Sequence, residues 1–368
     1  MSSPANMPSR AIMSRSRTTA AAVSFAMVGV LLAACGSSGD AGSSGTGGPE
    51  KLTYVSYGGS GQDAQIEAFQ KPYTAAHPNV TFVNSSPADV AQVKAQVLAG
   101  AVQWDVVSVA PAAAKQNCGT LFEKLSLPNL KPADFTDKGI GECYVGNFAN
   151  ATIFGYNADK YPDPSKAPQT LKDFFDTAKF PGKRGVITNL QNGILEYPLL
   201  ADGVAPDKLY PLDVDRALKK WDTIRKDTLF APNVGALQQA AGSNQVDMFL
   251  LADSRMIALL NDKKNVKMVW DTTVVSVNAL AVPLGSKHKA AAEDFLQSVV
   301  QPGPSAKISE LLATPPINRA AQPNLSANGK LVAANGPANT GKTVVQDIDW
   351  YADNFDKVTT RLTNWLVG

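Results

Sequence analysis

Residues 336–343 read "GPANTGKT" and fit the phosphate-binding pattern G-x-x-x-x-G-K-[ST] letter for letter. In that pattern backbone N–H groups of a glycine-rich loop hold phosphates and the lysine reaches the outer ones. A functional phosphate-binding loop lies between a buried strand and the start of a helix. A later strand of the same sheet carries the acid that binds magnesium. Here the preceding "KLVAAN" is a poor strand, and only a short tail follows Thr343. We therefore interpret residues 321–343 as a polar surface loop in which Lys342 is solvated.

Other catalytic patterns are no stronger. The two histidines, His77 and His288, stand apart from each other and from cysteines, which does not fit metal-ligand spacing. No G-x-S-x-G nucleophile elbow occurs. The paired carboxylates of glycoside hydrolases have no sequence signature, so a secreted hydrolase stays open as an alternative. The favoured interpretation is a protein that is not an enzyme.

The N-terminus indicates export. Residues 1–34 contain Arg10, Arg15 and Arg17, no acid, and a final apolar run "AAAVSFAMVGVLLAA" that is short for a bilayer span. The junction "LAAC" resembles a bacterial lipobox, which predicts lipidation of Cys35 after removal of a signal peptide. A Gly/Ser tract follows and behaves as a flexible tether. The sequence therefore predicts a body anchored by lipid to the outer face of the cell membrane, or a periplasmic one.

Charge and cysteine content limit the partners. Loss of residues 1–34 removes three of the 34 basic residues and none of the 32 acidic ones, so the exported body is close to neutral. A neutral surface gives no electrostatic reason to expect nucleic-acid binding. If Cys35 is lipidated, Cys118 and Cys143 are the two remaining cysteines. In an exported protein such a pair favours a disulfide over a metal site or a reactive thiol.

Strand-like and helical stretches alternate from Lys51 onward. Strands are expected at residues 51–57, 80–86 and 104–110, with helices at 62–76 and 88–100 between them. The alternation resumes after Thr152 and ends in a helix whose apolar stripe includes Trp365. Strand–helix–strand order predicts an α/β fold with mostly parallel sheets, and ligands of such sheets lie beyond the carboxyl ends of strands. That rule points to "YGGSG" at residues 57–61 and to Ser108.

Four segments in this order resemble the extracellular solute-binding proteins of ABC importers, in the spermidine/putrescine-binding branch. They are "VSYGGSGQDAQ", then "WDVVSV" with "NCGTLFEKL", then "ECYVGNFANATIFGYNADK" with "FPGKRGV", and the tail "DIDWYADNFDKVTTRLTNWL". The resemblance spans nearly the whole exported chain. It implies a two-lobe, periplasmic-binding-protein-like fold of type II, with the solute held in a cleft between lobes, and it supports a bond between the two remaining cysteines. It also implies no cofactor, a monomer, and delivery to a membrane permease whose cytoplasmic partner hydrolyses ATP. A ferric-ion-binding protein of similar fold is an alternative, although no adjacent tyrosine pair is present to ligate iron.

The resemblance also predicts the domain organisation. The two segments that cross between lobes fall near residues 150–153 and 271–276. The expected division is a lipoprotein signal peptide at 1–34, a Gly/Ser tether at 35–50, the first part of lobe one at 51–150, lobe two at 151–273, and the rest of lobe one with a C-terminal helix at 274–368.

The candidate ligand contacts depart from those of polyamine binders. Where such proteins carry acids after a strand of lobe two, this chain reads "TNLQNG", with Asn189 and Gln191, and Glu196 follows further on. An aromatic residue and an acid expected in the return strand are replaced by Ser276 and Asn278. Asp253 and Arg255 instead offer one charge of each sign, which suits a zwitterion or a carboxylate better than a polyamine.

Each candidate contact has an alternative role. Asp253 and Arg255 could be a helix cap and a surface group, Asn189 could end its strand in a turn, and Trp350 could be packed instead of lining the cleft. The turn after the first strand, with Tyr57, Gly58, Gly59 and Ser60, is the strongest candidate, because glycine lets the backbone approach a ligand. Ser108, Ser276 and Asn278 rest on resemblance of position alone.

Overall fold

The computed structural model describes residues 48–336, 339 and 341–368. The predicted signal peptide, Cys35 and most of the tether lie outside the described residues. The strands are β1 (Glu50–Val55), β2 (Val80–Ser85), β3 (Val106–Val109), β4 (Ile140–Gly141), β5 (Tyr144–Asn157), β6 (Arg184–Ile187), β7 (Thr228–Ala231), β8 (Met248–Ala252), β9 (Val266–Ala281) and β10 (Lys342–Val345).

These strands form one sheet with the order β2-β1-β3-β9-β5-β8-β6-β7, with β10 added to β9 and β4 to β5. Pairing is parallel at both ends, within β2-β1-β3 and within β8-β6-β7. It is antiparallel in the middle, where β3, β9, β5 and β8 follow one another. The expected parallel strand–helix units are therefore present at each end of the sheet, and antiparallel strands join them.

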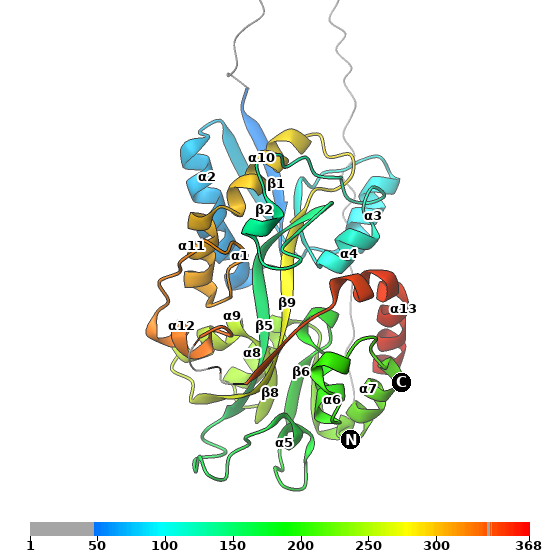
Figure 1. Cartoon of the computed structure of the whole chain (residues 1–368), viewed down its shortest axis with the longest axis vertical. Coiled ribbons are helices and arrows are strands. Elements are labelled where there is room, and N and C mark those ends of the chain that lie inside the picture. The colour runs from blue at the N-terminus through cyan, green and yellow to red at the C-terminus, as the bar shows by residue number, and fades with distance from the viewer. Residues whose placement is uncertain (1–47, 337–338, 340) are drawn as a thin grey trace, which may run out of the picture. The chain divides into compact units, whose positions relative to one another are not determined.

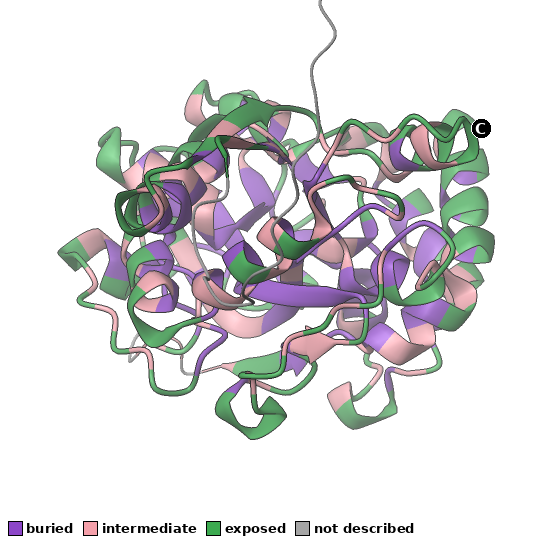
Figure 2. Cartoon of the chain, turned by 90° about the horizontal axis from the view of Figure 1, so that it is seen from above, coloured by how far each residue is buried: buried purple, intermediate pink, exposed green. Residues whose placement is uncertain are grey.

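Helices cover the sheet on both sides of β5 and β9 (Figure 1). The α-helices are α1 (Gly59–Gln65), α2 (Lys71–Ala76), α3 (Val90–Leu98), α4 (Pro111–Gln116), α5 (Leu171–Phe175), α6 (Glu196–Ala201), α7 (Val214–Asp222), α8 (Val234–Gly242), α9 (Asp253–Asn261), α10 (Lys289–Val299), α11 (Pro302–Leu312), α12 (Ala327–Val332) and α13 (Ile348–Val367). A π-helical segment, Ile66–Gln70, joins α1 to α2, so that the helix expected at 62–76 is one continuous helical run. Buried residues gather on the inner strands and on the inward faces of the helices (Figure 2).

Two long strands run the length of the sheet. β5 has 14 residues and β9 has 16, and they pair antiparallel from Val145↔Leu280 to Asn157↔Val266. The apolar runs at residues 266–270 and 274–283 predict two separate strands, whereas the structure has one strand that continues through residues 271–273. At this point the pairing with β5 shifts register between Thr152 and Phe154, and the strand is supported by β10, which pairs with Thr272 and Thr273.

The interpretation of residues 321–343 as a loop is wrong in two places. Ser326 caps α12 by accepting a hydrogen bond from the Gly329 N–H, which turns part of the supposed poor strand into a helix. β10 begins at Lys342 and pairs parallel with β9, from Lys342↔Thr272 to Val345↔Val275. The lysine and threonine of "GPANTGKT" therefore start a strand, whereas a phosphate loop would place them at the start of a helix. Residues 337, 338 and 340 lie outside the described residues.

A third difference concerns helix length. The segment "LKDFFDTAKF" predicts a helix over residues 171–180, but α5 ends at Phe175. Asp176 leaves the helical conformation and accepts hydrogen bonds from the N–H groups of Ala178 and Lys179. The disulfide agrees with the sequence. Cys118 and Cys143 are bonded, with their Cα atoms 5.5 Å apart.

Candidate functional site

The turn after β1 has the open backbone that the sequence predicted. Gly58 and Gly59 have φ values of 78° and 60°, a region that residues with a Cβ rarely adopt, and α1 starts at Gly59. Tyr57 is 44 % exposed, yet the surrounding protein raises its pKa to about 12 by desolvation. The ring of Tyr57 is therefore accessible from solvent at this turn.

Arg255 reaches this turn from the opposite end of the sheet. It stands in the first turn of α9, directly after β8, and its Nη1 donates a hydrogen bond of 2.5 Å to Oγ of Ser60. Burial lowers the pKa of Arg255, and no acidic group among the described residues offsets that effect. The guanidinium is thus partly desolvated and lacks a carboxylate partner within the described chain. Such a group can bind a carboxylate supplied by a ligand.

Asp253 has another environment. Its carboxyl group is fully buried and accepts hydrogen bonds from the N–H of Ala151 in β5 (3.0 Å) and from the N–H of Ser254 (2.7 Å). Burial raises its pKa well above the usual value for aspartate. The structure therefore places Asp253 inside the protein as a link between α9 and β5, and does not bring it together with Arg255 at the surface.

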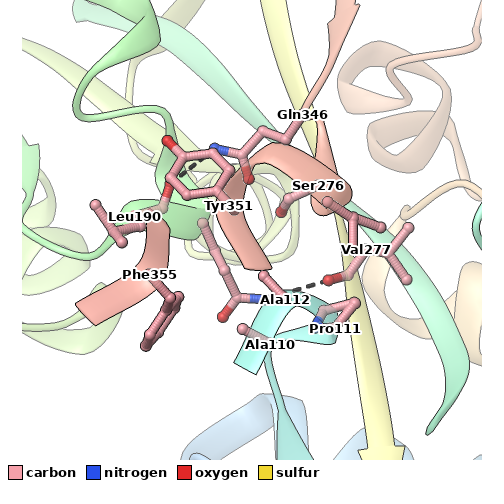
Figure 3. A pocket seen from close by; sticks show the side chains of 11 residues that line it. Ala110, Pro111, Ala112, Leu190, Ser276, Val277, Gln346, Tyr351 and Phe355 are labelled. Carbon is pink, nitrogen blue, oxygen red and sulfur yellow. Dashed lines mark hydrogen bonds between the residues drawn. The ribbon is translucent and has the colours of Figure 1, made fainter. Parts of the chain in front are cut away.

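A small cavity, with about 30 Å³ of space for water-sized molecules, lies between the end of β3, the segment after β6, the middle of β9 and the start of α13 (Figure 3). Its polar lining comes from Gln191, Ser276, Gln346 and Tyr351. The remaining lining residues are apolar: Ala110, Pro111, Ala112, Leu190, Val277, Ile348 and Phe355. Ser276 is the one candidate from the sequence that lines this cavity. A space of this size has room for about one water molecule.

Behind this cavity lies a buried acid that was not among the predicted ligand contacts. Glu196, the first residue of α6, is fully buried, and its Oε1 accepts hydrogen bonds from the hydroxyls of Tyr210 and Tyr351 (both 2.7 Å). Oε1 also accepts one from Nε2 of Gln346 (2.8 Å), whereas Oε2 has no partner. Desolvation raises the pKa of Glu196. A single acid in the apolar run "GILEYPLLA" was the available signal, and a surface position explains such an acid equally well from sequence alone.

A second buried polar network lies beneath the turn after β1. Gln65 accepts a hydrogen bond from the Tyr54 hydroxyl (2.5 Å) and one from Nδ2 of Asn147 (3.0 Å). It donates to Ser56 Oγ and to the carbonyl of Gly61, both at 3.0 Å. The network fixes the turn to β1, to α1 and to β5. Gln65 and Asn147 were not among the residues predicted from the sequence.

Of the other predicted contacts, two are buried polar side chains without a partner, and two cap or pack against neighbouring elements. Ser108 Oγ and Asn278 Oδ1 are buried without a hydrogen-bond partner on neighbouring strands β3 and β9. Asn189 caps the short 3₁₀ helix Leu190–Asn192 by accepting from the N–H of Asn192, and its side chain is exposed. Trp350 packs on Tyr210 with ring centroids 5.7 Å apart and does not line the cavity.

The described part of the chain has neither a membrane-spanning helix nor a cluster of metal-binding side chains. None of its helices combines the length and the apolar character needed to cross a lipid bilayer. No three side chains of His, Cys, Asp or Glu there are grouped so that they could hold a metal ion.

Comparison with known proteins decides the family. Residues 64–338 match the sequence profile of the bacterial extracellular solute-binding proteins, which is most of the chain. The chain belongs to this family. The expected two-lobe type II architecture is confirmed by the solved structures that it resembles. It is a substrate-binding component of ABC import, and its relatives are transport proteins without enzymatic activity.

Similar proteins bind amino acids or their conjugates, as their names state. The gamma-aminobutyric acid-binding protein of Pseudomonas aeruginosa is 28% identical over 323 residues, which cover 86% of this chain and 91% of that protein. The solved structure of the Atu4243-GABA receptor is 31% identical with a TM-score of 0.76, covering 86% of this chain and 97% of that one. The binding protein AgtB of A. tumefaciens R10, in complex with agropinic acid, is 29% identical with a TM-score of 0.76, covering 87% and 99%.

Proposed function

We propose that this solute-binding protein captures a small zwitterion that carries an amine and a carboxylate, of the γ-aminobutyrate type, and delivers it to a membrane permease. One observation carries the proposal. Arg255 is a partly desolvated cation at the turn after β1, and its one hydrogen bond within the described chain goes to a neutral hydroxyl, that of Ser60. A carboxylate on the solute would complete it, because the guanidinium fork matches a carboxylate geometrically.

The turn after β1, which faces Arg255, also supports the proposal. Gly58 and Gly59 let backbone N–H groups approach an anion at the start of α1, and Tyr57 offers an accessible ring beside them. An added Cβ on Gly59 would lie 3.6 Å from Nη1 of Arg255, so the turn and the guanidinium are in contact range. Because Gly59 has no side chain, its backbone faces the guanidinium directly.

A zwitterion agrees better with this site than a polyamine does. A polyamine needs carboxylates near its ammonium ends, whereas this turn presents the cation Arg255 without a carboxylate partner within the described chain. The named ligands of the similar proteins, γ-aminobutyric acid and agropinic acid, are acids. The resemblance to the spermidine/putrescine branch is therefore, in our proposal, a likeness of fold and not of ligand.

We propose that the lobes divide at residues 150/151 and 273/274. In support, Asn150 pairs with Ser276, Ala151 with Val275 and Thr152 with Val274, so both proposed crossings lie side by side in the sheet. Arg255 and Ser60 would then belong to different lobes, and their hydrogen bond would span the cleft. A solute that contacts both lobes would favour the closed form.

Lipid anchoring through Cys35 remains part of this proposal and is supported by the "LAAC" junction. In this arrangement the body is held at the outer face of the membrane near its permease.

Isothermal titration calorimetry of residues 36–368 tests the solute class. The panel is γ-aminobutyrate, 5-aminovalerate, proteinogenic amino acids, agropinic acid, butyrate, butylamine, putrescine and spermidine. We expect one of the zwitterions to bind in the micromolar range or tighter, and both butyrate and butylamine to bind at least tenfold more weakly. Tightest binding of putrescine or spermidine would refute the proposed class and restore the polyamine interpretation.

A further inference from the structure

Gln65, the last residue of α1, carries a buried amide whose hydrogen-bonding groups are all used. Its Nε2 donates to Oγ of Ser56 and to the carbonyl of Gly61, both at 3.0 Å. Its Oε1 accepts from the Tyr54 hydroxyl (2.5 Å) and from Nδ2 of Asn147 (3.0 Å). The Gly61 carbonyl can only accept, so it determines which end of the amide faces the turn. The side chain is therefore held in a single orientation.

The two groups that receive the Nε2–H bonds lie on either side of the turn after β1. Ser56 directly follows β1, and Gly61 lies in the first turn of α1. Between them Gly58 and Gly59 have positive φ, and Gly58, as the residue before the helix, has no side chain with which to cap α1. Glycine leaves such a segment with more conformational freedom than other residues do. Gln65 reduces that freedom because it ties the two ends of the turn together.

The end of the turn that Gln65 holds faces Arg255. Oγ of Ser60 accepts a hydrogen bond of 2.5 Å from Nη1 of Arg255. A Cβ added to Gly61 would lie 3.8 Å from Nη2 of the same guanidinium. The residue whose carbonyl Gln65 binds is therefore itself in contact range of Arg255. Because one peptide bond joins Ser60 to Gly61, a displacement of Gly61 would also change the distance from Ser60 to the guanidinium.

Asn147 connects the same amide to β5. It is buried, and it lies where the pairing of β5 with β9 shifts register between Gly146 and Phe148. An irregularity of this kind redirects a side chain out of the regular alternation of a strand. Here the side chain of Asn147 meets Oε1 of Gln65. The turn is thus fixed relative to a strand of 14 residues as well as to the short helix α1.

We propose that Gln65 is a positioning residue for solute capture. It acts through the turn: by fixing Gly61 relative to Ser56 and β5, it holds Ser60 and the glycine backbone opposite Arg255 before the solute arrives. A turn that is already ordered loses little conformational entropy on binding, and preorganisation of this kind raises affinity. This inference rests on the proposed function, since it explains how the protein maintains the turn that faces the solute carboxylate together with Arg255.

The test is calorimetric titration of γ-aminobutyrate, or of another zwitterion of the panel if it binds the wild type more tightly. Gln65→Met keeps the length of the side chain and removes its donors and its acceptor. The turn can then adopt other conformations, and we expect the dissociation constant to rise about tenfold, which corresponds to about 1.4 kcal/mol.

Gln70→Met is the matched control. Gln70 is also a buried amide, it belongs to the same helical run, and it exchanges hydrogen bonds of 2.8 and 2.9 Å with Asn84 of β2. Its loss should lower the melting temperature, as the loss of Gln65 does, because buried partners are left unpaired in both variants. The dissociation constant of Gln70→Met should stay within about threefold of the wild-type value.

Two further variants separate positioning from stability. Tyr54→Phe removes one donor to Oε1 of Gln65 but leaves the bond from Asn147 and both bonds to the ends of the turn. It should lower the melting temperature and keep the dissociation constant within about threefold of the wild-type value. In an Arg255→Lys background, Gln65→Met should raise the dissociation constant by a smaller factor than in the wild type, because both changes affect the same contact with the carboxylate.

The outcomes separate the two proposals. If a zwitterion binds the wild type and Gln65→Met equally well, or if Gln70→Met weakens binding as much as Gln65→Met does, the positioning role is refuted while the solute class stands. If Gln65→Met does not fold, Gln65→Glu takes its place: it has the same size and at most one hydrogen to donate instead of two, so an unchanged dissociation constant refutes the role. If no zwitterion binds the wild type, the proposed function fails, and this inference fails with it.

Discussion

Replacement of Arg255 by methionine is the most direct test of how this protein holds its solute. Methionine keeps much of the aliphatic volume and removes the guanidinium. Loss of one partner from a buried, hydrogen-bonded charge pair costs about 2–5 kcal/mol. That corresponds to a dissociation constant raised by about 30-fold to 4,000-fold. Because Arg255 already has one N–H committed to Ser60 and four remaining, it can still grip a carboxylate bidentately, and we expect the middle of that range.

The assay is calorimetric titration of the tightest zwitterion into wild type, Arg255→Met and Arg255→Lys. Lysine keeps the charge without the fork, so its loss should be smaller, on the order of tenfold. Arg216→Met is the matched control, because Arg216 lies on the surface and pairs with Asp202 at 2.7 Å. Circular dichroism checks that each variant folds. If the dissociation constant of Arg255→Met lies within about threefold of the wild-type value, a difference of about 0.65 kcal/mol, Arg255 contacts only Ser60 and does not bind the solute carboxylate.

Three further predictions concern stability and location. Reduction of the Cys118–Cys143 bond, which spans a sequence separation of 25, should lower the free energy of unfolding by about 3.5 kcal/mol, and equal denaturation midpoints with and without reductant would contradict this. The pKa of buried Asp253 is raised on folding, so its contribution to stability is greatest below about pH 4 and is lost as the pH rises. The melting temperature of Asp253→Asn should therefore change less between pH 4 and 8 than that of the wild type. Parallel curves of melting temperature against pH for the two proteins would contradict this. Cys35→Ala should release the protein from cell membranes into the soluble fraction, as measured by fractionation, and unchanged membrane association would exclude a lipid anchor.

The order of elements could be predicted because it depends on local pattern. The first three strands and the helices between them appear within a few residues of their expected positions, since alternating and 3.6-residue periodicities are local properties. The tail after residue 320 could not be predicted in this way. β10 is a strand only because β9 offers it an edge, and no local pattern encodes a partner about 70 residues distant.

For the candidate site, too, contacts between residues distant in sequence could not be predicted. The glycine turn and Arg255 could be proposed as contacts because their chemistry can be recognised from residue type. Asp253 carries the same chemistry as a ligand contact would, and only its buried hydrogen bond to Ala151 shows that it has a structural role. The hydrogen bond between Glu196 and Gln346 could not be predicted because it joins residues 150 positions apart. Such contacts are set by packing, which a single sequence does not display.

The pairing of β5 with β9 has a consequence for the energetics of solute capture. If these strands are the connections between lobes, as we propose, the connections are already ordered by backbone hydrogen bonds before any solute arrives. Fixing the backbone of a flexible linker would cost roughly 1–2 kcal/mol per residue. Here little of that conformational entropy is left to lose, so most of the contact free energy of a small solute can appear as affinity. This offers a physical reason why a molecule with only a handful of heavy atoms could be held tightly by a protein of this size.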